Sequence, residues 1–120
     1  MKKMPEIKGE YDVGVAYWGD RTMFYMCDKV KAKKKIAWLH FDYANPPRDD
    51  DIYRAYFEKC DKVVTVSKPI DESLKAHLPD IAPRCVMMEN ITNPKQIWDL
   101  ALRGDTFPDT HFTGKRILTI

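Results

Sequence analysis

A histidine lies where an apolar run gives way to a polar loop, in the segment KIAWLHFDY that spans residues 35–43. In open α/β sheets, ligands bind in the crevice at the carboxyl ends of the strands. His40 would therefore face such a crevice while a rigid strand holds it, with Asp42 and Tyr43 one step beyond. The alternative is that His40 is an ordinary strand-end residue bonded to a neighbouring loop.

The motifs of several common chemistries are missing. The chain has neither GxGxxG nor GxxxxGK[ST], which argues against nucleotide binding through a glycine-rich phosphate loop, and it has no GxSxG nucleophile elbow. His40 and Asp42 could contribute to a metal site, but His-x-Asp alone is weak evidence. We therefore expect no metal and no resident cofactor. Cys27, Cys60 and Cys85 are far apart in sequence and are interpreted as buried thiols in a reducing setting.

Length and charge narrow the function further. With 120 residues, the chain is one small domain or a piece of a larger one. The formal net charge of +2 provides no strong field for nucleic acid, so no nucleic-acid partner is expected. No apolar run is long enough to cross a bilayer, and the first residues lack the pattern of a signal peptide. We expect a cytoplasmic protein.

Strand-like and helix-like patterns alternate along the chain. Strands are predicted at 11–17, 35–39, 62–66 and 85–88, and helices are predicted to begin near Asp20, Asp49, Ser67 and Asn93. This alternation predicts an α/β fold, a Rossmann-like parallel sheet flanked by helices on both faces. Residues 1–102 would form this partial domain, 103–114 a linker, and 115–120 the first strand of a further domain.

A strongly basic run precedes the second predicted strand. It comprises Lys29, Lys31, Lys33, Lys34 and Lys35. The favoured interpretation is a solvated helix end, where cations suit the negative end of the helix dipole. The alternative is contact with an anionic sugar-phosphate or, peripherally, with an anionic membrane surface at the inner face of the membrane. The three tryptophans, Trp18, Trp38 and Trp98, fall in different elements and are interpreted as core residues rather than as a sugar-stacking platform.

The order of segments is similar to that of a known enzyme family. YDVGVAYWGD, KKKIAWLHFDY, YRAYFEKCDKVVTVSKPIDESL, VMMENITNPKQI and KRILTI together resemble family-4-type glycosyltransferases of the GT-B fold, over roughly residues 10 to 120. The matching part is the second half of the acceptor-side Rossmann-like domain, continuing through the hinge. Glu89-Asn90-Ile91 stands where the family usually has a Pro-Asn-Gly-type turn.

The resemblance implies roles for particular residues. His40 matches the family histidine near the transferred sugar, so it would be the catalytic residue, orienting donor or acceptor hydroxyls or stabilising the reacting groups. Asp42 and Tyr43 would line the acceptor side. Ser67 and Asn90 match further substrate-binding positions at the cleft. Such enzymes transfer a sugar from a sugar-nucleotide donor to a hydroxyl of a glycan or lipid-linked acceptor, and many build surface polysaccharides.

The donor-binding motifs of that family are not in the chain. These are a glycine-arginine turn, a basic residue for the diphosphate, and paired glutamates on a helix. Because two domains must close to build the active site, we expect the chain to be inactive alone. The alternative hypothesis is a non-catalytic α/β module that binds a glycan or a protein and forms a homodimer to cover its sheet.

Overall fold

The structure, a computed structural model, describes residues 3–103 and 113–115. It divides into two units, Met1–Asn90 and Ile91–Ile120.

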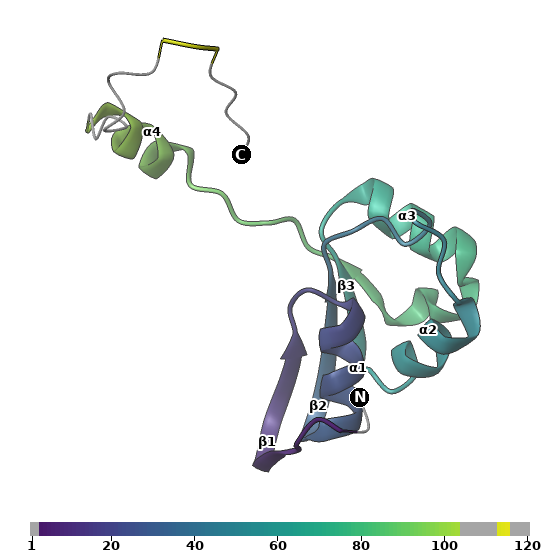
Figure 1. The fold of residues 1–120 in the computed structure, drawn as a ribbon. Coiled ribbons are helices and arrows are strands. Elements are labelled where there is room, and N and C mark those ends of the chain that lie inside the picture. The colour runs from purple at the N-terminus through teal and green to yellow at the C-terminus, as the bar shows by residue number, and fades with distance from the viewer. Residues whose placement is uncertain (1–2, 104–112, 116–120) are drawn as a thin grey trace. The chain divides into compact units, whose positions relative to one another are not determined.

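The first unit is built around a parallel sheet of four strands (Figure 1). The strands are β1 (Ile7–Ala16), β2 (Val30–Leu39), β3 (Lys62–Thr65) and β4 (Cys85–Met87), paired in the order β1-β2-β3-β4. The connections contain α1 (Asp20–Lys29), α2 (Asp50–Phe57), α3 (Lys68–His77) and a short 3₁₀ helix, Pro79–Arg84. The predicted α/β, Rossmann-like arrangement is confirmed.

All three α-helices of this unit pack on one face of the sheet. Ala16, Ala37 and Val63 are register partners across three strands, so they lie in one row on the same face. They form a single buried cluster with side chains from every helix, namely Met23 and Met26 of α1, Tyr53 and Phe57 of α2, and Leu74 of α3. Consecutive strand order explains this, because right-handed crossovers that always step in the same direction place each helix on the same side. The expectation of helices on both faces is therefore wrong for this unit.

The opposite face of the sheet is open along its first strand. Val13 and Val15 alternate with the buried residues Gly14 and Ala16, and their side chains are 52% and 50% exposed. β1 is also an edge strand, because it comes first in the order of the described sheet and has β2 on one side only. A strand with apolar residues on both faces is typical of a sheet that is covered on both sides.

The helix starts agree with the predicted positions but not always with the predicted caps. The α2 helix starts where the carboxylates from Asp49 onward predicted it, and Asp49 itself is the cap, accepting a hydrogen bond from the backbone N–H of Ile52 at 3.0 Å. Ser67 occupies the N-cap position of α3, yet its side chain makes no capping bond. Asp20 is not the cap of α1, since Gly19 holds that position and Asp20 is the first residue of the helix.

Four of the five lysines of the basic run belong to a strand, which corrects their interpretation as a solvated helix end, while Lys29 does lie in the last turn of a helix. β2 begins at Val30, directly after Lys29 closes α1. Lys33 contacts the carboxylate of Asp12 at 2.7 Å, and Lys34 contacts that of Asp61 at 3.0 Å. These exposed pairs neutralise part of the run.

The second unit contains α4 (Pro94–Leu102), which begins after Asn93 as predicted. The Asn93 side chain accepts a hydrogen bond from the backbone N–H of Gln96 at 3.1 Å. The apolar side chains of α4 are exposed, and Trp98, interpreted as a core residue, is 67% exposed. Most of the predicted linker at 103–114 and of the strand at 115–120 lies outside the described residues. None of the described helices is long and apolar enough to span a membrane.

Candidate functional site

The carboxyl ends of the parallel strands bring together residues from separate parts of the chain. β1 ends at Ala16 and is followed by Tyr17 and Trp18, and β2 ends at Leu39 and is followed by His40. Because β1 and β2 are neighbours, these three rings meet at the carboxyl ends of the two strands, which we call the carboxyl edge of the sheet. This is the edge at which α/β sheets bind ligands.

His40 lies between two aromatic rings. The Tyr17 ring centroid is 4.7 Å from the imidazole centroid, and the Trp18 ring lies almost parallel to the imidazole, at 5.7 Å and 6°. Tyr17 and Trp18 are 58% and 59% exposed, so Trp18 is not the core residue that the sequence analysis expected. The site therefore presents aromatic surface to solvent around a half-buried imidazole.

Two ring nitrogens at this edge have no hydrogen-bond partner among the described residues. They are Nε2 of His40 and Nε1 of Trp38, and both are shielded from solvent. Tyr17 lies between them, with its centroid 5.1 Å from the Trp38 ring. A buried polar atom without a partner is unfavourable by about 1–3 kcal/mol, so such atoms are suited to bind a polar ligand group.

The turn that carries Trp18 depends on a glycine. Gly19 has φ +78°, a conformation that side chains disfavour, and a Cβ atom there would lie 2.6 Å from Cδ2 of Leu39. The next residue, Asp20, also has a positive φ of 50°, and its carboxylate accepts a hydrogen bond from the Tyr53 hydroxyl at 2.7 Å. The turn is thus packed against the end of β2 and tied to α2.

Asp42 organises the loop beside His40. Its exposed carboxylate accepts hydrogen bonds from the Ser73 hydroxyl at 2.6 Å and from the backbone N–H of Ala44 at 3.0 Å. These two bonds, that from Ser73 first, hold the pKa of the Asp42 carboxyl below its usual value. Asp42 is therefore ionised and joins the loop to α3, the helix that carries Ser73.

Tyr43 is buried beneath the same loop. It is 1% exposed, and its hydroxyl donates to the carboxylate of Asp50 at 2.7 Å. Burial, followed by this bond to Asp50, raises the pKa of the Tyr43 phenol. Arg48 secures the loop above it by donating to the carbonyls of Asp42 and Tyr43 at 2.9 and 2.8 Å, and its guanidinium lies 4.1 Å from the Phe41 ring centroid. In this arrangement Tyr43 supports the loop rather than presenting its hydroxyl to solvent.

The two remaining predicted site residues lie at strand ends as well. Ser67 is half-buried at the start of α3, two residues after β3 ends. Asn90 is exposed and is the last residue of the first unit. His40 and Asp42 thus lie in one strand-to-helix loop, and the sequence analysis missed Tyr17 and Trp18. Their signal was an aromatic pair at the end of the first predicted strand, with Tyr17 as its last residue and Trp18 directly after it.

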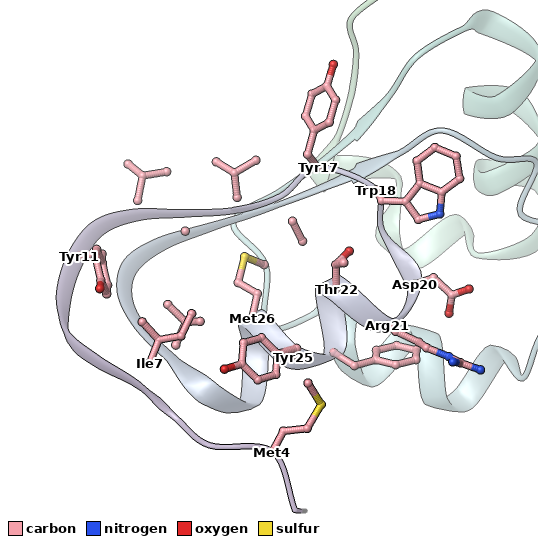
Figure 2. A pocket seen from close by; sticks show the side chains of 16 residues that line it. Met4, Ile7, Tyr11, Tyr17, Trp18, Asp20, Arg21, Thr22, Tyr25 and Met26 are labelled. Atoms are coloured by element: carbon pink, nitrogen blue, oxygen red, sulfur yellow. The ribbon is translucent and has the colours of Figure 1, made fainter. Parts of the chain in front are cut away.

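An apolar groove reaches the same edge from β1 and α1 (Figure 2). Its volume is about 1240 Å³, and it extends from Met4 and Ile7 along the two elements to Tyr17 and Trp18. Tyr25 and Met26 of α1 lie in its wall. Within the described ranges, no three His, Cys, Asp or Glu side chains are grouped so that they could hold a metal ion.

This arrangement can bind and orient an uncharged polar molecule. Exposed aromatic rings provide apolar surface for the faces of a sugar ring, and the imidazole provides a donor or acceptor for a hydroxyl.

Comparison of the chain with protein-family models, with curated proteins and with solved structures gave no match.

Proposed function

We propose that the chain is the acceptor-side portion of a sugar-nucleotide-dependent glycosyltransferase, of the GT-B type that its sequence resembles. The observation that carries the proposal is the placement of His40. It follows β2 at the carboxyl edge of a parallel sheet, it is flanked by Tyr17 and Trp18, and its Nε2 atom has no partner among the described residues.

In this proposal the exposed Tyr17 and Trp18 rings shift to uncover Nε2 of His40, which then binds a hydroxyl of the sugar acceptor. Trp18 stacks on the sugar ring, and the loop fixed by Asp42 and Arg48 keeps the imidazole in place. Ser67 and Asn90 contribute further polar groups from the neighbouring strand ends. The donor sugar nucleotide is bound by a second domain, and closure of the two domains orients the reactants. The chain alone binds an acceptor without turning it over.

A second candidate function is a non-catalytic module that binds a glycan or protein and forms a homodimer. The open sheet face favours it, because Val13 and Val15 on β1 are half exposed. Within the described sheet, β1 pairs with β2 along one side, and its outer side is a ready template for association with a second chain. The basic run is a poor membrane anchor in this arrangement, since Lys33 and Lys34 are paired with Asp12 and Asp61.

Two-dimensional NMR of the labelled chain with simple glycans, sugar nucleotides and free nucleotides tests the proposal. We expect the glycans to shift the resonances of Trp18 and His40 while free nucleotides leave them unchanged. Trp18→Ala and His40→Ala should each weaken glycan binding by about tenfold or more, as expected for the loss of a stacking or hydrogen-bond partner. Trp98→Ala, in α4, and His77→Ala, on α3, are the matched controls.

Two results would contradict the proposal. One is a set of shifts confined to the second unit, and the other is glycan binding that is equally weakened by Trp98→Ala.

Sedimentation separates the two candidates, because a stable dimer whose affinity falls on Val15→Lys favours the self-associating module. Sequencing the surrounding reading frame tests the catalytic part. A glycine-arginine turn and paired glutamates downstream would support it, and a stop codon directly after Ile120 would oppose it.

A further inference from the structure

The structure brings together two cysteines that the sequence analysis treated as separate buried thiols. Cys27 lies in the last turn of α1, and Cys60 lies between α2 and β3. Their sulfur atoms are 3.7 Å apart, although 33 positions separate them in the chain. Neither cysteine is in a disulfide. The pair lies near the amino-terminal ends of the strands, at the opposite end of the sheet from His40.

The surroundings of the pair hold both cysteines in place. Both sulfur atoms lie near the backbone carbonyl of Tyr56, at 3.8 Å for Cys27 and 3.5 Å for Cys60. The Lys35 ammonium donates to the Cys27 carbonyl at 2.9 Å, and the Arg84 guanidinium donates to the Cys60 carbonyl at 2.7 Å. The two backbones are thus fixed while the side chains remain close enough for small rotations to join them.

The two thiols differ in access and in acidity. Cys60 is 1% exposed, whereas Cys27 is partly exposed and lines an open depression of about 470 Å³ with Lys35. The hydrogen bond with Cys60 lowers the pKa of the Cys27 thiol, and the charges of Lys35 and Lys59 act in the same direction. The same hydrogen bond, together with burial, raises the pKa of the Cys60 thiol. Cys27 is therefore the accessible nucleophile, and Cys60 is the protected partner.

We propose that Cys27 and Cys60 form a reactive dithiol that hydrogen peroxide converts into an intramolecular disulfide. In the first step the Cys27 thiolate attacks one peroxide oxygen. An S–O bond forms, the O–O bond breaks, and the departing hydroxide takes a proton to become water. Cys27 is oxidised to a sulfenic acid and the peroxide is reduced.

In the second step the sulfur of Cys60 attacks the sulfur of Cys27. The S–S bond forms, the S–O bond breaks, and the leaving hydroxide takes the Cys60 proton as a second water. Two thiols and one peroxide thus become one disulfide and two waters. The product connects the end of α1 to the segment that follows α2, and it is independent of the proposed glycan site.

Peptide mapping of the native chain after brief peroxide treatment tests this proposal. Trypsin separates the three cysteines into the peptides 22–29, 60–62 and 85–95. We expect the first two to be linked in the native monomer, with a loss of two hydrogen atoms in mass. The same treatment in urea is the control, because in an unfolded chain the shorter loop between Cys60 and Cys85 is favoured.

Single-cysteine variants test the order of the two steps. Cys60→Ser should leave Cys27 as a sulfenic acid that a dimedone probe labels. Cys27→Ser should leave Cys60 unlabelled because its sulfur is shielded, and Cys85→Ser should retain the cross-link. Circular dichroism verifies that each variant is folded. The peptide map of the wild-type chain tests the Cys27–Cys60 disulfide even if a variant fails to fold. A native disulfide that involves Cys85, a cross-link between two chains, or a Cys27 that is only over-oxidised would overturn the proposal.

Discussion

Replacing Gly19 by alanine should destabilise the first unit through two separable effects. The backbone at Gly19 has φ +78° and ψ −157°, a region almost restricted to glycine, which costs a residue with a side chain about 1–3 kcal/mol. The new Cβ would also lie 2.6 Å from Cδ2 of Leu39 and 3.2 Å from both Cε1 of Phe41 and the carbonyl oxygen of Trp38. Leu39 is fully buried and cannot swing away, so overpacking adds about 1–3 kcal/mol.

The sum predicts a loss of about 2–6 kcal/mol in the free energy of unfolding. For a unit of this size, that corresponds to a fall in melting temperature of about 10 °C or more. Urea unfolding followed by far-UV circular dichroism measures the change directly. Because the turn also carries Trp18, its fluorescence should report a displaced indole in the folded variant.

Two other glycines separate the two effects. Gly9 also has a positive φ of 103°, but a Cβ there would only touch the hydroxyl oxygen of Tyr11 at 3.7 Å. Gly14 has no such backbone conformation, yet a Cβ there would lie 3.2 Å from the Cβ of Ala32. We expect Gly9→Ala to show the backbone effect alone and Gly14→Ala a mild packing effect. The reasoning is refuted if Gly19→Ala is no more destabilising than Gly9→Ala.

Two further predictions concern pH. The pKa of Asp42 is lowered in the folded state, chiefly by Ser73, so this bond contributes stability above about pH 3.8, and the contribution is lost as the pH falls through the lower folded pKa. Ser73→Ala should therefore be less stable than the wild type at neutral pH and equal to it in strong acid, and a constant difference across the pH range would contradict this. The hydrogen bond to Asp28 raises the pKa of Tyr56 to about 12, so stability present below pH 10 is lost as the pH rises toward 12. In Asp28→Asn, tyrosinate absorbance should show this phenol titrating nearer to 10, and an unchanged titration curve would exclude the assigned cause.

Local patterns were sufficient to predict most of the elements. The β-branched run at 62–66 became β3, and the carboxylates from Asp49 onward marked the start of α2, because cap and propensity act over a few residues. The basic run was misassigned since its strand is stabilised by distant partners. Asp12 and Asp61 meet Lys33 and Lys34 only after the sheet has formed.

The candidate site was predictable only in part. The position of His40 follows from a strand end, which is a local signal. The rings that flank it come from the neighbouring strand, so Tyr17 and Trp18 could be placed beside it only with the register of β1 against β2 known. Tyr43 was predicted as a site residue, but it is buried and bonded to Asp50. Both features depend on tertiary packing, which no local sequence pattern reports.

The consecutive strand order has a consequence for how the chain folds. Each new strand pairs with the one made just before it, through partners such as Val15 with Ile36, Ile36 with Lys62, and Val63 with Cys85. These separations are similar, and loop-closure entropy grows only slowly with length, so each addition meets nearly the same barrier. The sheet can thus grow in the direction of synthesis, with no early strand waiting for a partner from the far end. Paired strands are thus as close in sequence as the helical crossovers of a parallel sheet allow, and the sheet can form stepwise as the chain leaves the ribosome.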